Sequence, residues 1–512
     1  MRWYRWQIEA GRPAPRRILF CLFMLTHFLS SFCRPRVLAL LALISLLATG
    51  PGIAQRKGPG TPPAGAAAVL SGVRVWLTTP DRETLFQLQP GALGAGTPGS
   101  SQPEIVVDDA QRYQTMDGFG YCLTGGSATL LHRMSTPARA ALLRELFSPG
   151  DPNGIGVSYL RVSIGASDLD PQVFSYDDLP AGQTDPTLAR FSLAPDRADL
   201  IPVLKEILAL NPTLKILGSP WSPPTWMKTN GDSKGGSLKP EFYDAYAQYF
   251  VKYLQSMAAE GIALDAITVQ NEPLHPGNNP SLLMPAAEQA AFVRQSLGPA
   301  FAKAGLKTKI ICYDHNADRP DYPLAVLGDA GAQPFVDGSA FHLYAGDIGA
   351  LSRVHDAFPD KNIYFTEQWV GAPGDFAKEL AWHVKNLIIG APRNWSRTVL
   401  EWNLAADPQQ NPHTPGGCTQ CLGAVTLNGD QVRREPAYYI IAHASKFVRP
   451  GSVRIASSNP AGLPNVAYRT AAGQRVLLVQ NEAAHAQTFR ICCQGKQVRS
   501  TLPAGAVATY VW

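Results

Sequence analysis

The hydrophobic and polar positions of the chain follow one rhythm in its middle and another at its two ends. From about residue 116, short apolar segments alternate with longer segments whose apolar residues recur every three or four positions. The short segments predict buried strands, and the longer ones predict amphipathic helices. Eight such rounds predict an α/β fold, a (β/α)8 TIM barrel over residues 116–447, because eight parallel strands close a barrel. The expected strands are 116–122, 159–164, 215–219, 266–270, 309–313, 338–343, 362–366 and 397–402, and the clearest helices are 135–147, 241–259, 286–304, 375–389 and 435–447.

On either side of the barrel, short segments alternate apolar and polar residues with a period of two, which is typical of antiparallel strands. They lie in residues 72–115 and 448–512, and a linker rich in glycine, proline and alanine is expected before them at 55–71. We therefore expect both ends of the chain to build one all-β side domain, a β-sandwich. An open doubly wound sheet is the alternative to the barrel, but no glycine-rich fingerprint follows the first strand.

Residues 1–54 have the pattern of a targeting leader rather than of a folded domain. Arginines precede an apolar run at 37–47, and small residues lead up to Ala54, after which cleavage is expected. The protein is therefore predicted to be exported to a periplasmic or extracellular compartment. A second apolar run at 18–32 leaves open a translation start at Met24 or a retained membrane anchor.

The composition narrows the classes of function. A net charge of +5 over 512 residues, with part of the basic charge in the leader, gives no nucleic-acid footprint. Cys418 and Cys421 have the spacing of metal ligands, but no second pair follows at zinc-ribbon distance. In an exported protein, a local disulfide in a surface loop is favoured over zinc. Cys122 and Cys312 lie in apolar strands and are expected to be buried thiols.

Two glutamates carry the candidate chemistry, because each follows a predicted barrel strand. Glu272 comes after the fourth strand and Glu367 after the seventh, and the carboxyl ends of barrel strands form the catalytic face. Two carboxylates at that face can act as a glycosidase, in which one protonates the leaving oxygen and the other attacks or stabilises the anomeric carbon. A single glutamate at a strand end is more often a cap or a salt-bridge partner, but two on opposed strands favour catalysis.

Several motifs surround these glutamates, and the longest runs from Ser219 to Gly231 with the sequence Ser-Pro-Trp-Ser-Pro-Pro-Thr-Trp-Met-Lys-Thr-Asn-Gly. The others are Met116-Asp117-Gly118-Phe119-Gly120, Asn271-Glu272-Pro273, Thr366-Glu367, Glu401-Trp402-Asn403-Leu404 and His443-Ala444-Ser445-Lys446-Phe447. In this order, from about residue 75 to 512, the chain resembles the glucosylceramidase family of retaining β-glycosidases, glycoside hydrolase family 30. Asn-Glu-Pro alone indicates only the wider clan of barrel glycosidases, whereas the longest motif is specific.

The resemblance implies that Glu272 is the general acid/base, Glu367 the nucleophile and Asn271 the residue that hydrogen-bonds the sugar 2-hydroxyl. The other residues that it implies bind the outer hydroxyls, floor the sugar pocket or support the carboxylates: Asp168, Trp221, Trp402, His342, Tyr344 and Arg161. His342 and Tyr344 are two positions apart in a strand, so their side chains share one face. The family mechanism requires neither a metal nor an organic cofactor, and we expect none.

Elementary chemistry adds an expectation for several of these residues. Trp221, between prolines, is expected to be exposed to the sugar, with core packing as the alternative. Arg161 lies in an apolar strand and needs a buried partner, either a catalytic or a structural carboxylate. Asp168 can accept sugar hydroxyls or cap a helix. Retention requires carboxyl groups about 5–5.5 Å apart, and Glu272 is expected to have a raised pKa because it shares the site with ionised Glu367.

The residues expected on the aglycone side of the site depart from the pattern of relatives that act on ceramide-linked substrates. Leu169 stands where an aromatic residue is expected, and residues 275–285 are polar and rich in proline, without an apolar rim. The expected function is a retaining β-glycosidase that hydrolyses β-linked glucosides, glucosylceramidase-like, with an endo-β-1,6-glucanase or a β-xylosidase as alternatives. An inactive carbohydrate-binding protein is the alternative from another class. Membrane contact is expected only if the leader is retained or the substrate is a lipid.

Overall fold

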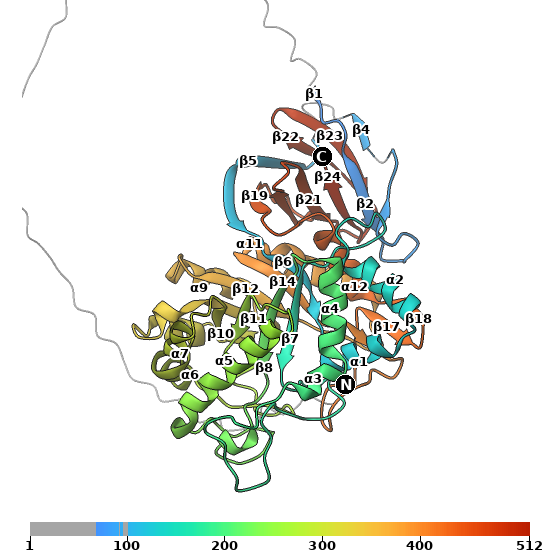
Figure 1. Ribbon diagram of the computed structural model, residues 1–512. Helices are drawn as coiled ribbons and strands as arrows, with labels where there is room; N and C mark the ends of the chain where they lie inside the picture. Colours follow the sequence, from blue (N-terminus) through green and yellow to red (C-terminus); the bar gives the residue numbers. More distant parts are fainter. Residues whose placement is uncertain (1–67, 92, 96–100) are drawn as a thin grey trace, which may run out of the picture. The chain divides into compact units, whose positions relative to one another are not determined.

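The computed structural model describes residues 68–91, 93–95 and 101–512 (Figure 1). The predicted leader, its cleavage site at Ala54 and most of the linker at 55–71 lie outside the described residues. Within the described part, every helix is too short or too polar to span a bilayer.

The barrel forms as predicted, with eight parallel strands closed into a ring. Each predicted strand coincides with an observed one, and strands such as β7 are buried along their whole length, which explains their continuous apolar runs. Interior side chains such as Tyr159, Leu217 and Ile311 fill the barrel as a packed core. In order around the ring the strands are β6 (Gly118–Cys122), β7 (Tyr159–Ile164), β8 (Lys215–Pro220), β9 (Ala266–Thr268), β10 (Lys309–Ala317), β11 (Val336–Gly346), β12 (Asn362–Glu367) and β14 (Ser396–Asn403).

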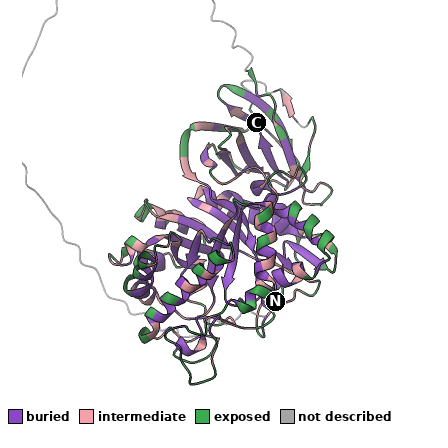
Figure 2. Ribbon diagram, in the orientation of Figure 1, coloured by how far each residue is buried: buried purple, intermediate pink, exposed green. Residues whose placement is uncertain are grey.

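Helices surround the barrel strands, with buried residues toward the strands and exposed residues toward solvent (Figure 2). The predicted start at Ser135 is confirmed, because its side chain accepts a hydrogen bond from the Ala138 amide. The helices predicted at 286–304 and 375–389 each contain a π-helical segment, η3 (Val293–Leu297) and η5 (Val384–Gly390), which a 3.6-residue period does not predict. The α-helices are α1 (Gly125–Arg133), α2 (Thr136–Phe147), α3 (Ala194–Ala198), α4 (Leu200–Leu210), α5 (Tyr243–Ala259), α6 (Ala286–Phe292), α7 (Gly298–Lys303), α8 (Asp321–Gly328), α9 (Ala350–Ala357), α10 (Phe376–His383), α11 (Ala391–Arg393) and α12 (Pro436–Ser445).

The side domain is built from both ends of the chain, as predicted. Its strands form one hydrogen-bonded sheet in the order β1-β23-β22-β5-β19-β20-β21-β24-β2-β3, with β4 paired to β23. β23 and β24 are far apart along this order, yet the Ser500 and Tyr510 hydroxyls lie 2.7 Å apart, so the sheet folds over onto itself. The strands are β1 (Ala68–Val69), β2 (Arg74–Thr78), β3 (Gln87–Leu88), β4 (Leu93–Ala95), β5 (Glu104–Thr115), β19 (Val453–Ser457), β20 (Asn465–Arg469), β21 (Arg475–Gln480), β22 (Gln487–Cys493), β23 (Lys496–Leu502) and β24 (Val507–Val511).

The loop after β14 is long and carries short strands of its own. Within it, β15 (Ala405–Ala406), β17 (Val425–Asn428) and β18 (Gln431–Arg434) form a small sheet. β16 (Cys421–Leu422) instead pairs with β13 (Val370–Gly371), which follows β12. The loops after the seventh and eighth barrel strands are therefore joined at the carboxyl ends of the barrel strands.

Candidate active site

Glu272 and Glu367 meet at the carboxyl ends of the barrel strands. Glu367 is the last residue of β12, and Glu272 follows the end of β9. Nδ1 of His342 lies 3.4 Å from Oε1 of Glu272 and 3.8 Å from Oε1 of Glu367. Because both oxygens contact one nitrogen, they are at most about 7 Å apart, a bound that admits the spacing of retaining glycosidases and excludes most of the inverting range.

The backbone around Glu272 is strained in a way that presents its side chain to the site. Glu272 has φ of 45°, in the left-handed region that side chains other than glycine seldom adopt. Its amide donates a hydrogen bond of 2.9 Å to the Asp314 carbonyl, and the Asn271 amide donates one of 2.8 Å to the Pro220 carbonyl. Neighbouring strands therefore hold this conformation, and such enforced strain is typical of functional sites.

Glu367 is held by one phenol and one guanidinium. The Tyr344 hydroxyl donates to Oε1 at 2.9 Å, and Nη1 of Arg161 donates to Oε2 at 2.5 Å. Arg161 is fully buried and also donates from Nη2 to Oδ1 of Asn271 at 2.7 Å. The expected carboxylate partner of Arg161 is therefore present, and the oxygen of the Asn271 amide is engaged while its NH2 group stays available to a ligand.

Asp314 is the hub of the buried network, and sequence reasoning missed it. A bulge in β10 between Tyr313 and His315 turns the fully buried Asp314 side chain inward. Its carboxylate accepts from Nη2 of Arg161 at 2.8 Å, from Thr366 at 2.6 Å and contacts Nε2 of His342 at 3.1 Å. Burial alone would raise the pKa of Asp314, but Arg161 and His342 outweigh burial and lower it. The only signal in the sequence was an aspartate ending an apolar strand.

Two imidazoles flank Glu272. His342 contacts Glu272 as described, and Nδ1 of His315 lies 3.6 Å from Oε1 of Glu272. Burial acts to raise the pKa of Glu272, but the close contacts and positive charge of these imidazoles outweigh burial and lower it. The raised pKa that we expected for Glu272 is therefore wrong for the unliganded site. The reason is that the expectation considered the charge of Glu367 and not two histidines, one of which was missed.

Trp221 and Trp402 form an aromatic wall beside the carboxylates. Their ring centroids are 5.4 Å apart, and the Arg161 guanidinium lies 4.8 Å from the centroid of Trp221. Trp221 is only 1% exposed and Trp402 only 4%. The expected exposure of Trp221 is therefore wrong, because its ring packs against Trp402 and Arg161. Trp221 nevertheless lines the cavity described below.

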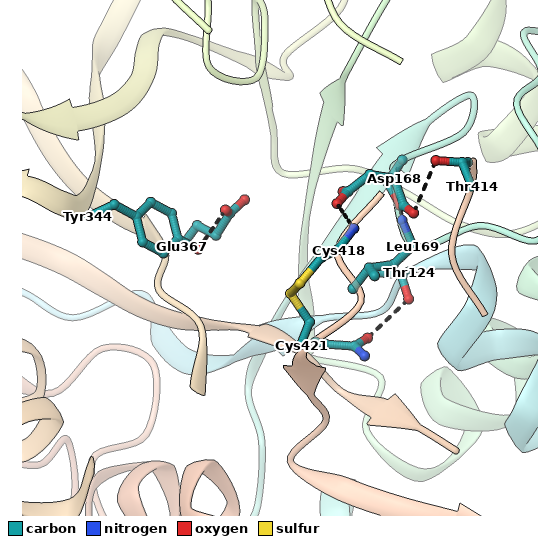
Figure 3. The surroundings of a disulfide bond; sticks show 10 residues. Thr124, Asp168, Leu169, Tyr344, Glu367, Thr414, Cys418 and Cys421 are labelled. Atoms are coloured by element: carbon teal, nitrogen blue, oxygen red, sulfur yellow. Dashed lines mark hydrogen bonds between the residues drawn. A yellow bond between two sulfur atoms is a disulfide. The ribbon is translucent and has the colours of Figure 1, made fainter. Parts of the chain in front are cut away.

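Asp168 lies across the cavity from Glu367 and is tied to the loop after β14 (Figure 3). The Cys418 amide donates to Oδ2 of Asp168 at 3.2 Å, and the Thr414 amide donates to its carbonyl at 2.9 Å. Burial, followed by the charge of Glu367, raises the pKa of Asp168 to about 7. The Asp168 carboxylate is buried and lines the cavity. It accepts a hydrogen bond from the loop after β14 instead of capping a helix.

The disulfide predicted between Cys418 and Cys421 is present. Its position differs from the expected surface loop, because both cysteines line the cavity and pack in one cluster with Trp402, Leu169 and Cys122. The loop is anchored by Thr414, whose hydroxyl donates to the Asn279 carbonyl at 2.6 Å. The thiols of Cys122 and Cys312 are buried, as expected.

A cavity of about 170 Å³ connects these groups, a volume suited to one sugar ring. The predicted residues that line it are Asp168, Trp221, Asn271, Glu272, Tyr344, Glu367 and Trp402. Arg161 and His342 lie behind this lining, where they contact the two glutamates. Sequence reasoning did not assign Asn278, Trp369, Cys418 and Cys421 to the site, because loops of different barrel strands bring them there.

These features define a barrel glycosidase: two carboxylates face one cavity at the carboxyl ends of a (β/α)8 barrel, with an aromatic wall and further hydrogen-bonding groups around them. Residues 116–448 match the model of the glycosyl hydrolase family 30 TIM-barrel domain, and residues 451–510 match that of the family 30 beta sandwich domain. The chain belongs to glycosyl hydrolase family 30 and is a retaining β-glycosidase of that family.

The chain is similar both to proteins named endo-1,6-β-glucanases and to proteins named glucosylceramidases, at different levels of sequence identity. It is 35% identical over 450 residues to the endo-1,6-beta-D-glucanase neg1 of Aspergillus fumigatus, covering 82% of this chain and 90% of that protein. It is 29% identical over 457 residues to the lysosomal acid glucosylceramidase of Mus musculus, covering 83% and 86%. A solved structure titled "The endo-beta1,6-glucanase BT3312" superposes with a TM-score of 0.80 and 34% identity, covering 86% and 99%. The chain is thus more similar to these two endo-1,6-β-glucanases than to the lysosomal acid glucosylceramidase of Mus musculus.

Proposed function

We propose that the protein hydrolyses β-1,6-linked glucan by a double displacement that retains the anomeric configuration. The observation that carries the mechanism is the contact of both glutamates with one His342 nitrogen beside a cavity the size of a sugar ring. The similarity to proteins named endo-1,6-beta-D-glucanases supports the choice of substrate.

Glu367 acts as the nucleophile. Its two oxygens are held by Arg161 and Tyr344, which fix the orientation of the carboxylate for attack on the anomeric carbon. The Asn271 NH2 group donates to the sugar 2-hydroxyl, a contact that strengthens as the oxocarbenium-like transition state forms. Attack forms the glycosyl–Glu367 ester and releases the leaving oxygen.

Glu272 acts as the acid and then as the base. In the free site the proton is held by the imidazole group of His342, whose pKa is raised to about 9: burial would lower it, but the charge of Glu367 and the contacts with Asp314 and Glu272 outweigh burial. A bound sugar covers Glu272 and removes its remaining contact with water, which raises the pKa of a carboxyl group. The proton then passes to Glu272 and on to the leaving oxygen, and Glu272 later takes a proton from the attacking water.

The mouth of the cavity supports a carbohydrate rather than a lipid on the leaving side. In the described part of the chain the large exposed hydrophobic residues are Val69, Leu88, Val106 and Trp382, and none of them lines the cavity. In the loop after Glu272, Leu282 and Met284 are buried, whereas His275 is exposed. A ceramide would need an apolar rim, which these residues do not provide.

Export after cleavage near Ala54 is part of the same proposal. The apolar run and small residues of the leader motivate it, and the Cys418–Cys421 disulfide supports it because disulfides persist in oxidising compartments. N-terminal sequencing of the protein from the culture medium or periplasm tests it, with Gln55 as the expected first residue.

The substrate proposal is tested by comparing turnover of pustulan, a β-1,6-glucan, with glucosylceramide in detergent and with aryl β-glucoside and β-xyloside. We expect pustulan to be the best polymer substrate and the first product to be the β-anomer by NMR. Glu272→Gln is the matched inactive control. Faster turnover of glucosylceramide than of pustulan would overturn the substrate, and an α-anomer as first product would overturn the mechanism.

A further inference from the structure

Glu272, His315 and His342 bring three metal-binding groups together at one side of the catalytic cavity. Oε1 of Glu272 lies 3.6 Å from Nδ1 of His315 and 3.4 Å from Nδ1 of His342, and one ligand atom from each of the three residues lies within 4.8 Å of the others. These separations are long for hydrogen bonds. They are close to the distance of about 3.3 Å between two ligands of a tetrahedral zinc ion with bonds of about 2.0–2.1 Å.

His315 provides an independent sign of a missing ligand. The residue is 7% exposed, and its buried Nδ1 atom has no hydrogen-bond partner among the residues that the structure describes. Buried polar atoms nearly always have a partner, so an unpaired imidazole nitrogen that faces a carboxylate and a second imidazole calls for a bound group. A metal ion bonded to all three would pair it.

His342 is oriented as metal-binding histidines usually are. Its Nε2 contacts Oδ1 of Asp314 at 3.1 Å, which leaves Nδ1 directed at Glu272. A carboxylate behind a histidine fixes the ring and strengthens it as a metal ligand. The surroundings also suit a cation, because Arg161 pairs with Glu367 and Asp314, whereas the ionic contacts of Glu272 among the described residues are with the two imidazoles.

We propose that Glu272, His315 and His342 bind a zinc ion that inhibits the enzyme. Two imidazoles and one carboxylate are a zinc ligand set, whereas magnesium and calcium prefer oxygen ligands alone. Glu272 lines the catalytic cavity, so an ion bonded to its carboxylate competes with the sugar there. The ion also binds the Glu272 carboxylate, which has to carry the catalytic proton. Zinc is therefore a competitor of the substrate and not a cofactor.

Zinc binding is measured by isothermal titration calorimetry on the exported protein, after a chelator has removed bound metal. We expect one equivalent of zinc to bind wild type, and at least about tenfold weaker binding to His315→Gln. His275→Gln is the matched control, because His275 is an exposed histidine three residues from Glu272. His342→Gln is a second variant, for which we expect the same loss of zinc affinity. Co2+ is a second probe: its visible absorption when bound reports four-coordination independently of turnover.

In steady-state kinetics with an aryl β-glucoside, zinc should raise KM and leave kcat unchanged. Equal zinc affinity in wild type and His315→Gln, loss of binding in His275→Gln, or inhibition that excess substrate does not relieve would each overturn the site. The calorimetric result does not depend on which glucan is the substrate, so failure of the β-1,6-glucanase proposal is distinguishable from failure of this one.

Discussion

The catalytic end of the barrel and the junction of the barrel with the β-sheet domain each bury a histidine completely, His342 and His443. His342 lies among carboxylates, which outweigh burial and raise its pKa to about 9. The ring nitrogens of His443, in α12, hydrogen-bond to the hydroxyls of Thr509 at 2.9 Å and Thr78 at 2.8 Å, and burial lowers its pKa to about 3. The surroundings of the same side chain thus favour the protonated form in one region and the neutral form in the other.

A third histidine shows that charge alone does not make a site. His383 in α10 is buried, contacts Glu401 at 2.7 Å and Glu379 at 3.1 Å, and has a pKa raised to about 9 because these carboxylates outweigh burial. Neither His383 nor its partners Glu379 and Glu401 line the catalytic cavity, whereas Glu272 and Glu367, which His342 contacts, do line it. A buried histidine therefore indicates chemistry only when its charged partners are accessible to a ligand.

The largest effect is expected at the nucleophile. Glu367→Gln should keep the contacts with Tyr344 and Arg161 but lower kcat/KM by at least about 10⁴-fold, because an amide does not attack the anomeric carbon. Hydrolysis of an aryl β-glucoside measures it. Glu401→Gln is the control, a buried glutamate outside the cavity that should lose stability and keep activity; equal loss of activity in both variants would contradict the assignment.

Replacing each buried histidine by glutamine separates the two regions. His342→Gln should lower kcat by about 10²-fold, because the group that holds the proton beside Glu272 is lost. His443→Gln should leave kcat unchanged and lower the free energy of unfolding by about 1–3 kcal/mol, because buried Thr78 and Thr509 hydroxyls lose a partner. Urea unfolding and steady-state kinetics on both variants measure this, and a similar fall in kcat for His443→Gln would remove the distinction.

The low pKa of His443 predicts how stability depends on pH. Between about pH 6.5 and 3 the unfolded chain binds a proton at this histidine and the folded protein does not, so the free energy of unfolding falls as pH falls, by up to about 1.4 kcal/mol per pH unit. The deficit of His443→Gln relative to wild type should therefore shrink between pH 7 and pH 5. Urea unfolding over this range tests it, and a constant deficit would show that His443 is not held neutral.

The smallest effect is expected from the disulfide loop. Changing both Cys418 and Cys421 to serine should raise KM about fivefold with little change in kcat, because a loosened loop loses the hydrogen bond of about 1 kcal/mol from the Cys418 amide to Asp168. Cys492→Ser, in β22 of the side domain, is the matched control. An unchanged KM in the double variant would mean that Thr414 and Asn279 suffice to hold the loop.

Local periodicity predicted most of the barrel and the two catalytic candidates. The strands could be found because parallel barrel strands are buried on both faces and read as apolar runs. The strands of the side domain are harder to delimit from the sequence. In β23, for example, the buried positions include Gln497 and Ser500, which hide the hydrophobic alternation. The π segments were missed because they interrupt the helical period.

In the site, residues within recognisable motifs could be assigned, and residues contributed by tertiary contacts could not. Asn271, Glu272 and Glu367 lie directly after strands, so their position followed from the barrel. The positions of the Asp314 and His315 side chains depend on a bulge in β10, which no residue pattern predicts. Trp221 was misjudged because its exposure depends on Trp402, from the other end of the barrel sequence.

The amino-acid sequence by itself determined the order of strands and helices, the pairing of both chain ends in one β domain and the two glutamates at strand ends, because these depend on local period and on the geometry of a closed barrel. Only the tertiary structure decided which groups surround the glutamates, where their proton resides and what closes the cavity. The physical reason is that pKa and exposure are set by neighbours in space, and in this site these come from seven barrel strands and the loops that follow them.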